Sequence, residues 1–300
     1  MGYIYITLSA FFFCLMTIFV KIAGQQLATT QIVLIRGIIT LCFTYAIIRR
    51  KNIWLWGKNY KILILRGITG TVALFCVYEA IQRFSLSEAT VIQYLFPIFT
   101  TLLASFLISE HIGKKLIFAI VLGFGGVYII LGLPFINPDT SFNTFSILIA
   151  IIGAFLTGLA YVLVRLASNM NESPYVIMFY FPLFTIPLSL PFAYSAWIPP
   201  SFNNWIALLL IGICAQIGQT FLTFGYKLLP ASKAAPTSYI QVPFSALAGV
   251  LIFYENISYN FILGSIVIFF AIFLIIEKRT QSEYKFLHSL MVLFPWFFIK

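Results

Sequence analysis

Long apolar runs separated by short polar stretches fill the chain from its first residues onward. A bilayer core about 30 Å thick needs roughly 20 apolar residues in a helix, and runs of that length recur. We therefore predict membrane-spanning helices over residues 3–23, 30–50, 62–82, 88–109, 114–133, 143–165, 173–194, 203–225, 233–253 and 259–277. The first run follows no basic residue and exceeds a signal-peptide core in length, so we expect a retained helix. These ten spans predict an all-α integral membrane protein.

Composition agrees with lipid as the solvent of these helices. Of the 300 residues, 61% are hydrophobic and 9% are charged, far from the balance of a soluble protein. A water-soluble bundle would need polar faces covering its apolar helices, and the sequence lacks such faces. The helices are therefore expected to face a lipid bilayer.

The formal net charge of +10 raises the question of nucleic-acid binding, but the basic residues gather in alternate loops. With the N-terminus inside, only Lys21 and Arg83 lie on the outer side. This asymmetry follows the positive-inside rule. We therefore expect both termini in the cytoplasm, a bacterial inner-membrane location and no nucleic-acid partner.

Residues for enzyme chemistry are sparse. The cysteines, Cys14, Cys42, Cys76 and Cys214, each lie inside a predicted span, where a thiol packs as a small apolar side chain. The two histidines belong to no cluster with metal-ligand spacing and to no nucleophile arrangement. We expect no disulfide, no metal, no cofactor and no enzyme activity.

The chain contains an internal repeat. Residues 87–97 align with residues 233–243, and each segment ends in a proline near the middle of its span, Pro97 and Pro243. A proline in a helix frees a backbone carbonyl and bends the helix, which suits a helix that borders a cavity. A simple packing kink explains the prolines equally well.

The repeat extends in both directions from these prolines. Glu110 and Glu255 close the two matching spans, and Lys21 in the first span is matched by Arg165 in the sixth. A carboxylate at such a position can cap the following helix and interact with its positive end. We expect a shared structural role for the two glutamates.

Three regions follow from the repeat: residues 1–136 and 137–280, each with five spans, and a tail at 281–300. Because five is odd, the second half enters the membrane from the opposite side, and the repeats are inverted. Inverted halves can exchange conformations and expose one midplane site to each side in turn. The tail is apolar but too short to span the membrane, and it is predicted to lie along the inner interface. The alternative is a regulatory or partner-binding segment.

Several short motifs accompany this organisation. An arginine precedes a glycine in residues 34–37 of the second span and again in residues 64–67 of the third, and residues 249–255 end the ninth span in glutamate. Together with five plus five spans, these motifs make residues 3–277 similar to the drug/metabolite transporter superfamily, of the EamA-like type. The resemblance implies that the first, third, fourth, sixth, eighth and ninth spans surround a central cavity. It also implies substrates among small organic metabolites.

Ionisable residues inside a membrane are costly and are candidates for function. Arg36 and Glu79 lie at similar depth near the outer ends of the second and third spans, so an ion pair that clamps the two helices is the favoured interpretation. The alternative is that Glu79 carries a proton or meets a cationic group of the substrate. Arg66 lies close enough to the cytoplasmic surface to snorkel, which favours a structural role.

Neutral polar and aromatic residues near the middle of spans are better candidates for substrate contact. These candidates are Phe75, Tyr78, Gln93, Tyr94, Tyr161, Gln216, Gln219, Tyr239 and Gln241. Gln216 and Gln219 are three residues apart and share a helix face, as do Phe75 and Tyr78, which could form an aromatic wall. For each aromatic the alternative is helix packing. Lys233 is a candidate gate residue, although an ordinary anchor at the inner surface is favoured.

These observations predict a carrier, monomeric or weakly dimeric, that moves a small polar metabolite across the membrane by alternating access. An amino acid or similar zwitterion is the first choice of substrate. The second is a nucleoside-bearing metabolite such as S-adenosylmethionine, whose base would stack on aromatic residues. A non-transporting or lipid-handling membrane subunit is the third interpretation.

Overall fold

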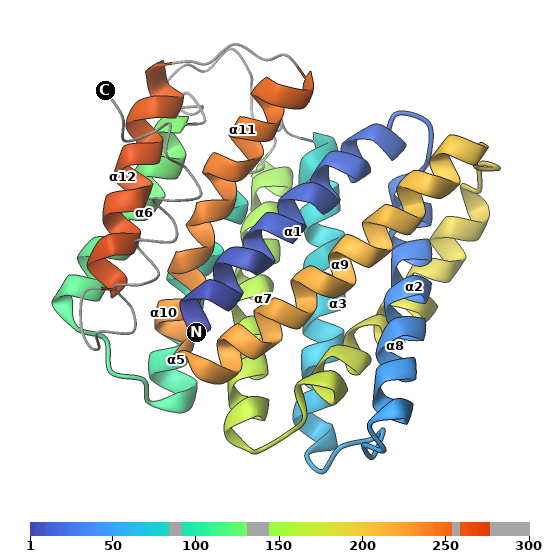
Figure 1. Ribbon diagram of the computed structural model, residues 1–300, viewed down its shortest axis with the longest axis horizontal. Helices are drawn as coiled ribbons and strands as arrows, with labels where there is room; N and C mark the ends of the chain where they lie inside the picture. Colours follow the sequence, from blue (N-terminus) through green and yellow to red (C-terminus); the bar gives the residue numbers. More distant parts are fainter. Residues whose placement is uncertain (84–91, 131–143, 254–258, 277–300) are drawn as a thin grey trace.

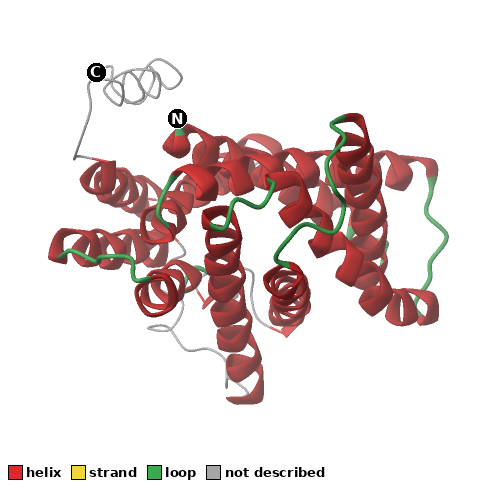
Figure 2. Ribbon diagram, turned by 90° about the horizontal axis from the view of Figure 1, so that it is seen from below, coloured by secondary structure: helices red, strands yellow, loops and turns green. Residues whose placement is uncertain are grey.

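The computed structural model describes residues 1–83, 92–130, 144–253 and 259–276. All regular elements in these ranges are helices, without strands (Figures 1 and 2). They are α1 (Gly2–Ala23), α2 (Thr29–Arg50), α3 (Tyr60–Arg83), α5 (Phe96–Ile108), α6 (Lys114–Ile130), α7 (Thr144–Asn169), α8 (Pro174–Ser195), α9 (Phe202–Leu228), α10 (Ala231–Thr237), the 3-10 helix η1 (Ser238–Ile240), α11 (Gln241–Phe253) and α12 (Tyr259–Ile276).

Six helices of the described part are long and apolar enough to cross a membrane: α1, α2, α3, α7, α8 and α9. Large apolar side chains point away from the bundle, as Phe106 and Leu251 do with 84% and 72% of their surface exposed. Such exposure is unfavourable in water and favourable in lipid. The chain is therefore a multi-pass membrane protein. The other predicted spans correspond to the shorter helices α5, α6 and α12 and to the broken segment from α10 to α11.

Helices from distant parts of the chain pack in pairs. α1 lies along α9, α2 along α8, α3 along α7 and α6 along α12 (Figure 1). Small residues allow the closest approach: a Cβ on Gly225 of α9 would lie 2.5 Å from Ile6 of α1. Each pair joins one helix from the first half of the sequence to one from the second, so the two halves share one core.

The helical backbone is interrupted just before both mid-span prolines. Residues 92–93 are helical, Tyr94 and Leu95 form a turn, and α5 begins with Pro97 in its first turn. In the second half, α10 gives way to the 3-10 turn η1 before α11, which contains Pro243. Proline cannot donate a backbone hydrogen bond, which explains why regular helix fails at these points.

Carboxylates from distant segments cap two helix starts. Glu110, after α5, accepts hydrogen bonds from the backbone N–H of Ala231 (2.8 Å) and Ser232 (2.9 Å) and from the Ser232 hydroxyl (2.7 Å). The expectation that Glu110 caps the following helix is therefore wrong, because the chain turns it towards α10 in the other half. Glu255, the matching residue, lies outside the described residues.

Glu172, between α7 and α8, performs the same task for α3. Its Oε1 atom accepts from the backbone N–H groups of Lys58 (2.8 Å) and Asn59 (2.6 Å) and from Asn59 Nδ2 (2.9 Å). Gly57 in this loop has φ +66°, and a Cβ there would lie 2.8 Å from Glu172 Oε2. A carboxylate is favourable here because the first N–H groups of a helix lack partners within the helix.

Candidate functional site

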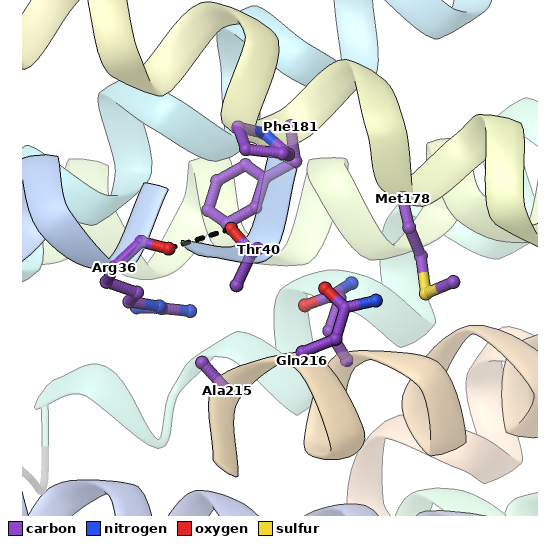
Figure 3. A pocket seen from close by; sticks show the side chains of 8 residues that line it. Arg36, Thr40, Met178, Phe181, Ala215 and Gln216 are labelled. Carbon is purple, nitrogen blue, oxygen red and sulfur yellow. Dashed lines mark hydrogen bonds between the residues drawn. The ribbon is translucent and has the colours of Figure 1, made fainter. Parts of the chain in front are cut away.

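A small pocket lies between α2, α8 and α9 (Figure 3). It is lined by Arg36, Thr40, Met178, Phe181, Pro182, Ala215, Gln216 and Gln219, and its accessible volume is about 10 Å³. In this conformation the pocket has room for about one water molecule. Two of its helices, α2 and α8, are ones that the family resemblance places outside the central cavity.

Helical spacing explains how polar side chains meet at this pocket. Arg36 and Thr40 are four residues apart on α2, and Gln216 and Gln219 are three apart on α9, so each pair projects from one helix face. The Thr40 hydroxyl donates to the backbone oxygen of Arg36 at 3.0 Å (Figure 3).

In the Gln216 amide, the oxygen has a hydrogen-bond partner among the described residues and the nitrogen has none. Its Oε1 accepts from the Thr44 hydroxyl at 3.1 Å, whereas its Nε2 is buried without a hydrogen-bond partner among the described residues. Gln219 Nε2 has only a long hydrogen bond, 3.5 Å, to the Thr223 hydroxyl. The pocket therefore presents an amide donor that the protein leaves unused.

Two buried arginines flank one aromatic ring. The guanidinium carbons of Arg36 and Arg66 lie 5.9 Å and 5.1 Å from the ring centroid of Phe181, and the side chains are 8% and 3% exposed. The Nε and Nη1 atoms of Arg66 have no hydrogen-bond partner in the described part of the chain. The expectation that Arg66 snorkels to the surface is wrong: α8 covers it and packs Phe181 against its head.

The candidates on α3 lie elsewhere. The Glu79 side chain is exposed, while Arg36 is buried at the pocket, and their ion pair stays a prediction. Phe75 is half-buried and packs on Phe192 of α8 with ring centroids 6.1 Å apart. The side chain of Tyr78 lies outside the described part of the structure, so the aromatic wall with Phe75 is also still a prediction.

Both helix interruptions carry a tyrosine, and these tyrosines meet. The rings of Tyr94 and Tyr239 are 5.9 Å apart, and Phe96 links Tyr94 (6.0 Å) to Tyr161 (5.3 Å). Tyr161 in turn lies 5.2 Å from Tyr226 of α9. We call these five residues the tyrosine cluster.

Polar atoms within the tyrosine cluster are also unsatisfied. The hydroxyls of Tyr226 and Tyr239 are buried without hydrogen-bond partners among the described residues. Buried polar groups are normally paired, and unpaired ones indicate a site that a ligand or water fills.

The remaining candidates take separate positions. Gln93 donates from Nε2 to the Thr157 hydroxyl on α7 at 3.3 Å, and Gln241 is half-buried at the start of α11. Lys233 lies half-buried in α10, one residue after the serine that Glu110 binds. The structure thus brings Arg36, Gln216 and Gln219 together at the pocket, and Tyr94, Tyr161 and Tyr239 in the tyrosine cluster.

Sequence reasoning missed three participants: Phe181, Thr40 and Tyr226. Tyr226 follows Gln219 by seven residues, a spacing that keeps it on the same helix face and that could have revealed it. Phe181 is one of 33 phenylalanines, and no local pattern distinguishes it.

Comparison with known proteins shows the family to which this chain belongs. The EamA-like transporter family matches residues 1–132 and 144–277. The chain belongs to the EamA-like transporter family. A crystal structure of a protein with 17% identity shares the fold with a TM-score of 0.78, over 90% of this chain and 94% of the other. At that identity the likeness shows the fold alone.

Curated relatives of this EamA-like transporter are transporters rather than enzymes. A pseudopaline exporter of Pseudomonas aeruginosa is 27% identical over 85% of this chain and 88% of its own. An S-adenosylmethionine uptake transporter of Rickettsia prowazekii is 26% identical over 76% and 78%. Solute carrier family 35 member G1 of the mouse is 28% identical over 86% and 73%. The substrate of an EamA-like transporter with these relatives is a small molecule.

Proposed function

We propose that this EamA-like transporter carries a small polar organic metabolite, an amino acid or related zwitterion, across the bacterial inner membrane by alternating access. The observation that carries the proposal is the group of unsatisfied polar atoms between α2, α3, α8 and α9, inside an otherwise apolar bundle. Polar groups are costly in a membrane interior unless a ligand, water or a partner satisfies them.

The proposed architecture has ten transmembrane helices in two inverted repeats, residues 1–136 and 137–280, with both termini in the cytoplasm. Two findings support it: the family matches two segments of similar length, and the helix interruption recurs at the same place in each half. The interruptions at Pro97 and Pro243 then serve as the points where the two halves bend. The tail at 281–300 lies outside the described residues.

S-adenosylmethionine is the second candidate substrate. The named function of the Rickettsia relatives favours it, and so do the paired rings of Tyr94 and Tyr239, which could receive a planar base. A lipid-handling role is less well supported, because Arg36, Gln216 and Gln219 line the pocket between α2, α8 and α9. We further propose a monomer or weak dimer that binds no nucleic acid.

Counterflow into proteoliposomes tests the transport proposal. Purified protein would be reconstituted into liposomes loaded with unlabelled amino acids or S-adenosylmethionine, and entry of the matching radiolabelled compound would be measured. We expect entry above protein-free liposomes for at least one compound, and a strong loss in Gln216→Leu but not in Gln25→Leu, an exposed control. Absence of counterflow for every compound would contradict the carrier proposal.

A further inference from the structure

Among the described residues, the arginine pair has no negative partner. Burial of a cation in a medium of low dielectric is unfavourable unless an anion accompanies it. Arg36 and Arg66 have only the face of Phe181, which attracts cations much more weakly than a carboxylate does. Neither has an ion-pair partner among the residues that the structure describes.

The carboxylates of the described ranges are all placed elsewhere. Glu110 is bound to the start of α10 and to Arg165, and Glu172 is bound to the start of α3. Glu79 has an exposed side chain on α3. In the described part of the chain, therefore, no acidic side chain neutralises the two guanidinium groups.

The geometry points to an anion site that the substrate completes. We propose that Arg36 and Gln216, which line the pocket, bind a carboxylate of the substrate and that Arg66, which packs on the same Phe181 ring, adds positive charge beside them; this inference rests on the proposed transport function. Guanidinium groups bind carboxylates through charge-assisted N–H donors, and Arg66 Nε and Nη1 have no hydrogen-bond partner among the described residues. Gln216 Nε2 supplies a further unused donor at the same pocket.

The pocket has room for about one water molecule in this conformation. It therefore admits a carboxylate only after its lining side chains move apart, as alternating access requires. On this proposal the substrate is an organic acid or zwitterion.

Matched compounds test the subsite directly. The melting temperature of purified protein would be measured with L-methionine and its methyl ester, with S-adenosylmethionine and its decarboxylated form, and with succinate and inorganic phosphate. Binding to the folded state raises the melting temperature. We expect the acids to raise it and the ester and decarboxylated forms to raise it far less. Equal shifts for acid and ester, or a shift with phosphate alone, would overturn the carboxylate assignment while leaving transport possible.

Arginine variants connect the shift to the site. Arg36→Gln and Arg66→Gln should each weaken acid binding by about tenfold or more, because each removes a charged hydrogen-bond donor. Arg50→Gln, at an exposed position at the end of α2, is the matched control and should bind as the wild type does. Unchanged acid binding in both buried variants would overturn the inference.

A gain of stability provides a test that needs no added compound. Gln216→Glu keeps the acceptor for the Thr44 hydroxyl and places a carboxylate at the pocket beside Arg36. We expect a higher melting temperature of the empty protein and loss of the response to acids, whereas Gln25→Glu at an exposed position should change neither. A lower melting temperature for Gln216→Glu would overturn the subsite, whatever the counterflow experiment shows about transport.

Discussion

Two arginine sites in this protein differ in the partners of their charge. At the end of the bundle where α9 meets α10, Arg165 Nη1 donates to the backbone oxygens of Tyr226 (3.1 Å) and Lys227 (2.7 Å). Arg165 Nε makes no hydrogen bond among the described residues but lies 3.7 Å from Glu110 Oε1, in an ion pair. In the interior, Arg36 and Arg66 have an aromatic ring and no anion among the described residues. The first site joins chain segments, and the second leaves its charge available.

The difference separates a structural site from a binding site. A charge that holds the fold together needs partners in the protein, whereas a charge that binds a substrate must leave some of its donors unused. Retaining such a charge lowers the stability of the empty protein. The arginines are thus distinguished by their partners and not by burial, since Arg66 and Arg36 are both more than nine-tenths buried.

Removal of the Glu110 carboxylate should have the largest effect on stability. Glu110→Ala leaves the N–H groups of Ala231 and Ser232 without their acceptor and the Arg165 guanidinium without its ion-pair partner. We expect a loss of about 3 kcal/mol in the free energy of unfolding, measured as a lower melting temperature and a lower folded yield. Wild-type melting would contradict a structural role for this site.

Displacement of Arg66 without removal of its charge should have an intermediate effect. A Cβ on Gly70 would clash with Arg66 Nη1, so Gly70→Ala moves the guanidinium off its position. We expect acid binding to fall by about tenfold while the empty protein melts near the wild-type temperature. Gly125→Ala is the control, because no atom lies within 4 Å of the added Cβ. Equal binding by the two variants would show that the position of Arg66 is unimportant.

Neutralisation of Glu79 should have the smallest effect. Its side chain is exposed on α3, so Glu79→Gln should change the free energy of unfolding by about 0.5 kcal/mol or less. We also expect counterflow to continue in this variant. If transport is abolished while the folded yield is normal, Glu79 carries a proton or contacts the substrate, and the arginine pair is not the principal charged site.

The positions of the helices were largely predictable because bilayer thickness fixes the length of apolar runs. The predicted spans 30–50 and 173–194 differ from α2 and α8 by one residue at most at each end. The helix interruptions were also foreseeable, since proline at the middle of a span prevents regular hydrogen bonding at Pro97 and Pro243.

The partners of charged residues were not predictable from local sequence. Position along α3 indicated that Arg66 reaches the surface. Instead its guanidinium packs against Phe181 on α8 and over Gly70, which has no side chain to exclude it. Likewise, sequence proximity suggested the next helix for Glu110, whereas the fold brings α10 to it from 121 residues away. Both outcomes depend on contacts between halves, which no single segment encodes.

The melting temperatures of two arginine variants, measured without any added compound, test the distinction most directly. Arg66→Met removes a buried charge that has no ion-pair partner among the described residues, and Arg165→Met removes one that is paired with Glu110. We predict that Arg66→Met melts about 2 °C or more above the wild type and that Arg165→Met melts below it. If Arg66→Met melts as far below the wild type as Arg165→Met does, Arg66 is a structural residue and the open anion site does not exist.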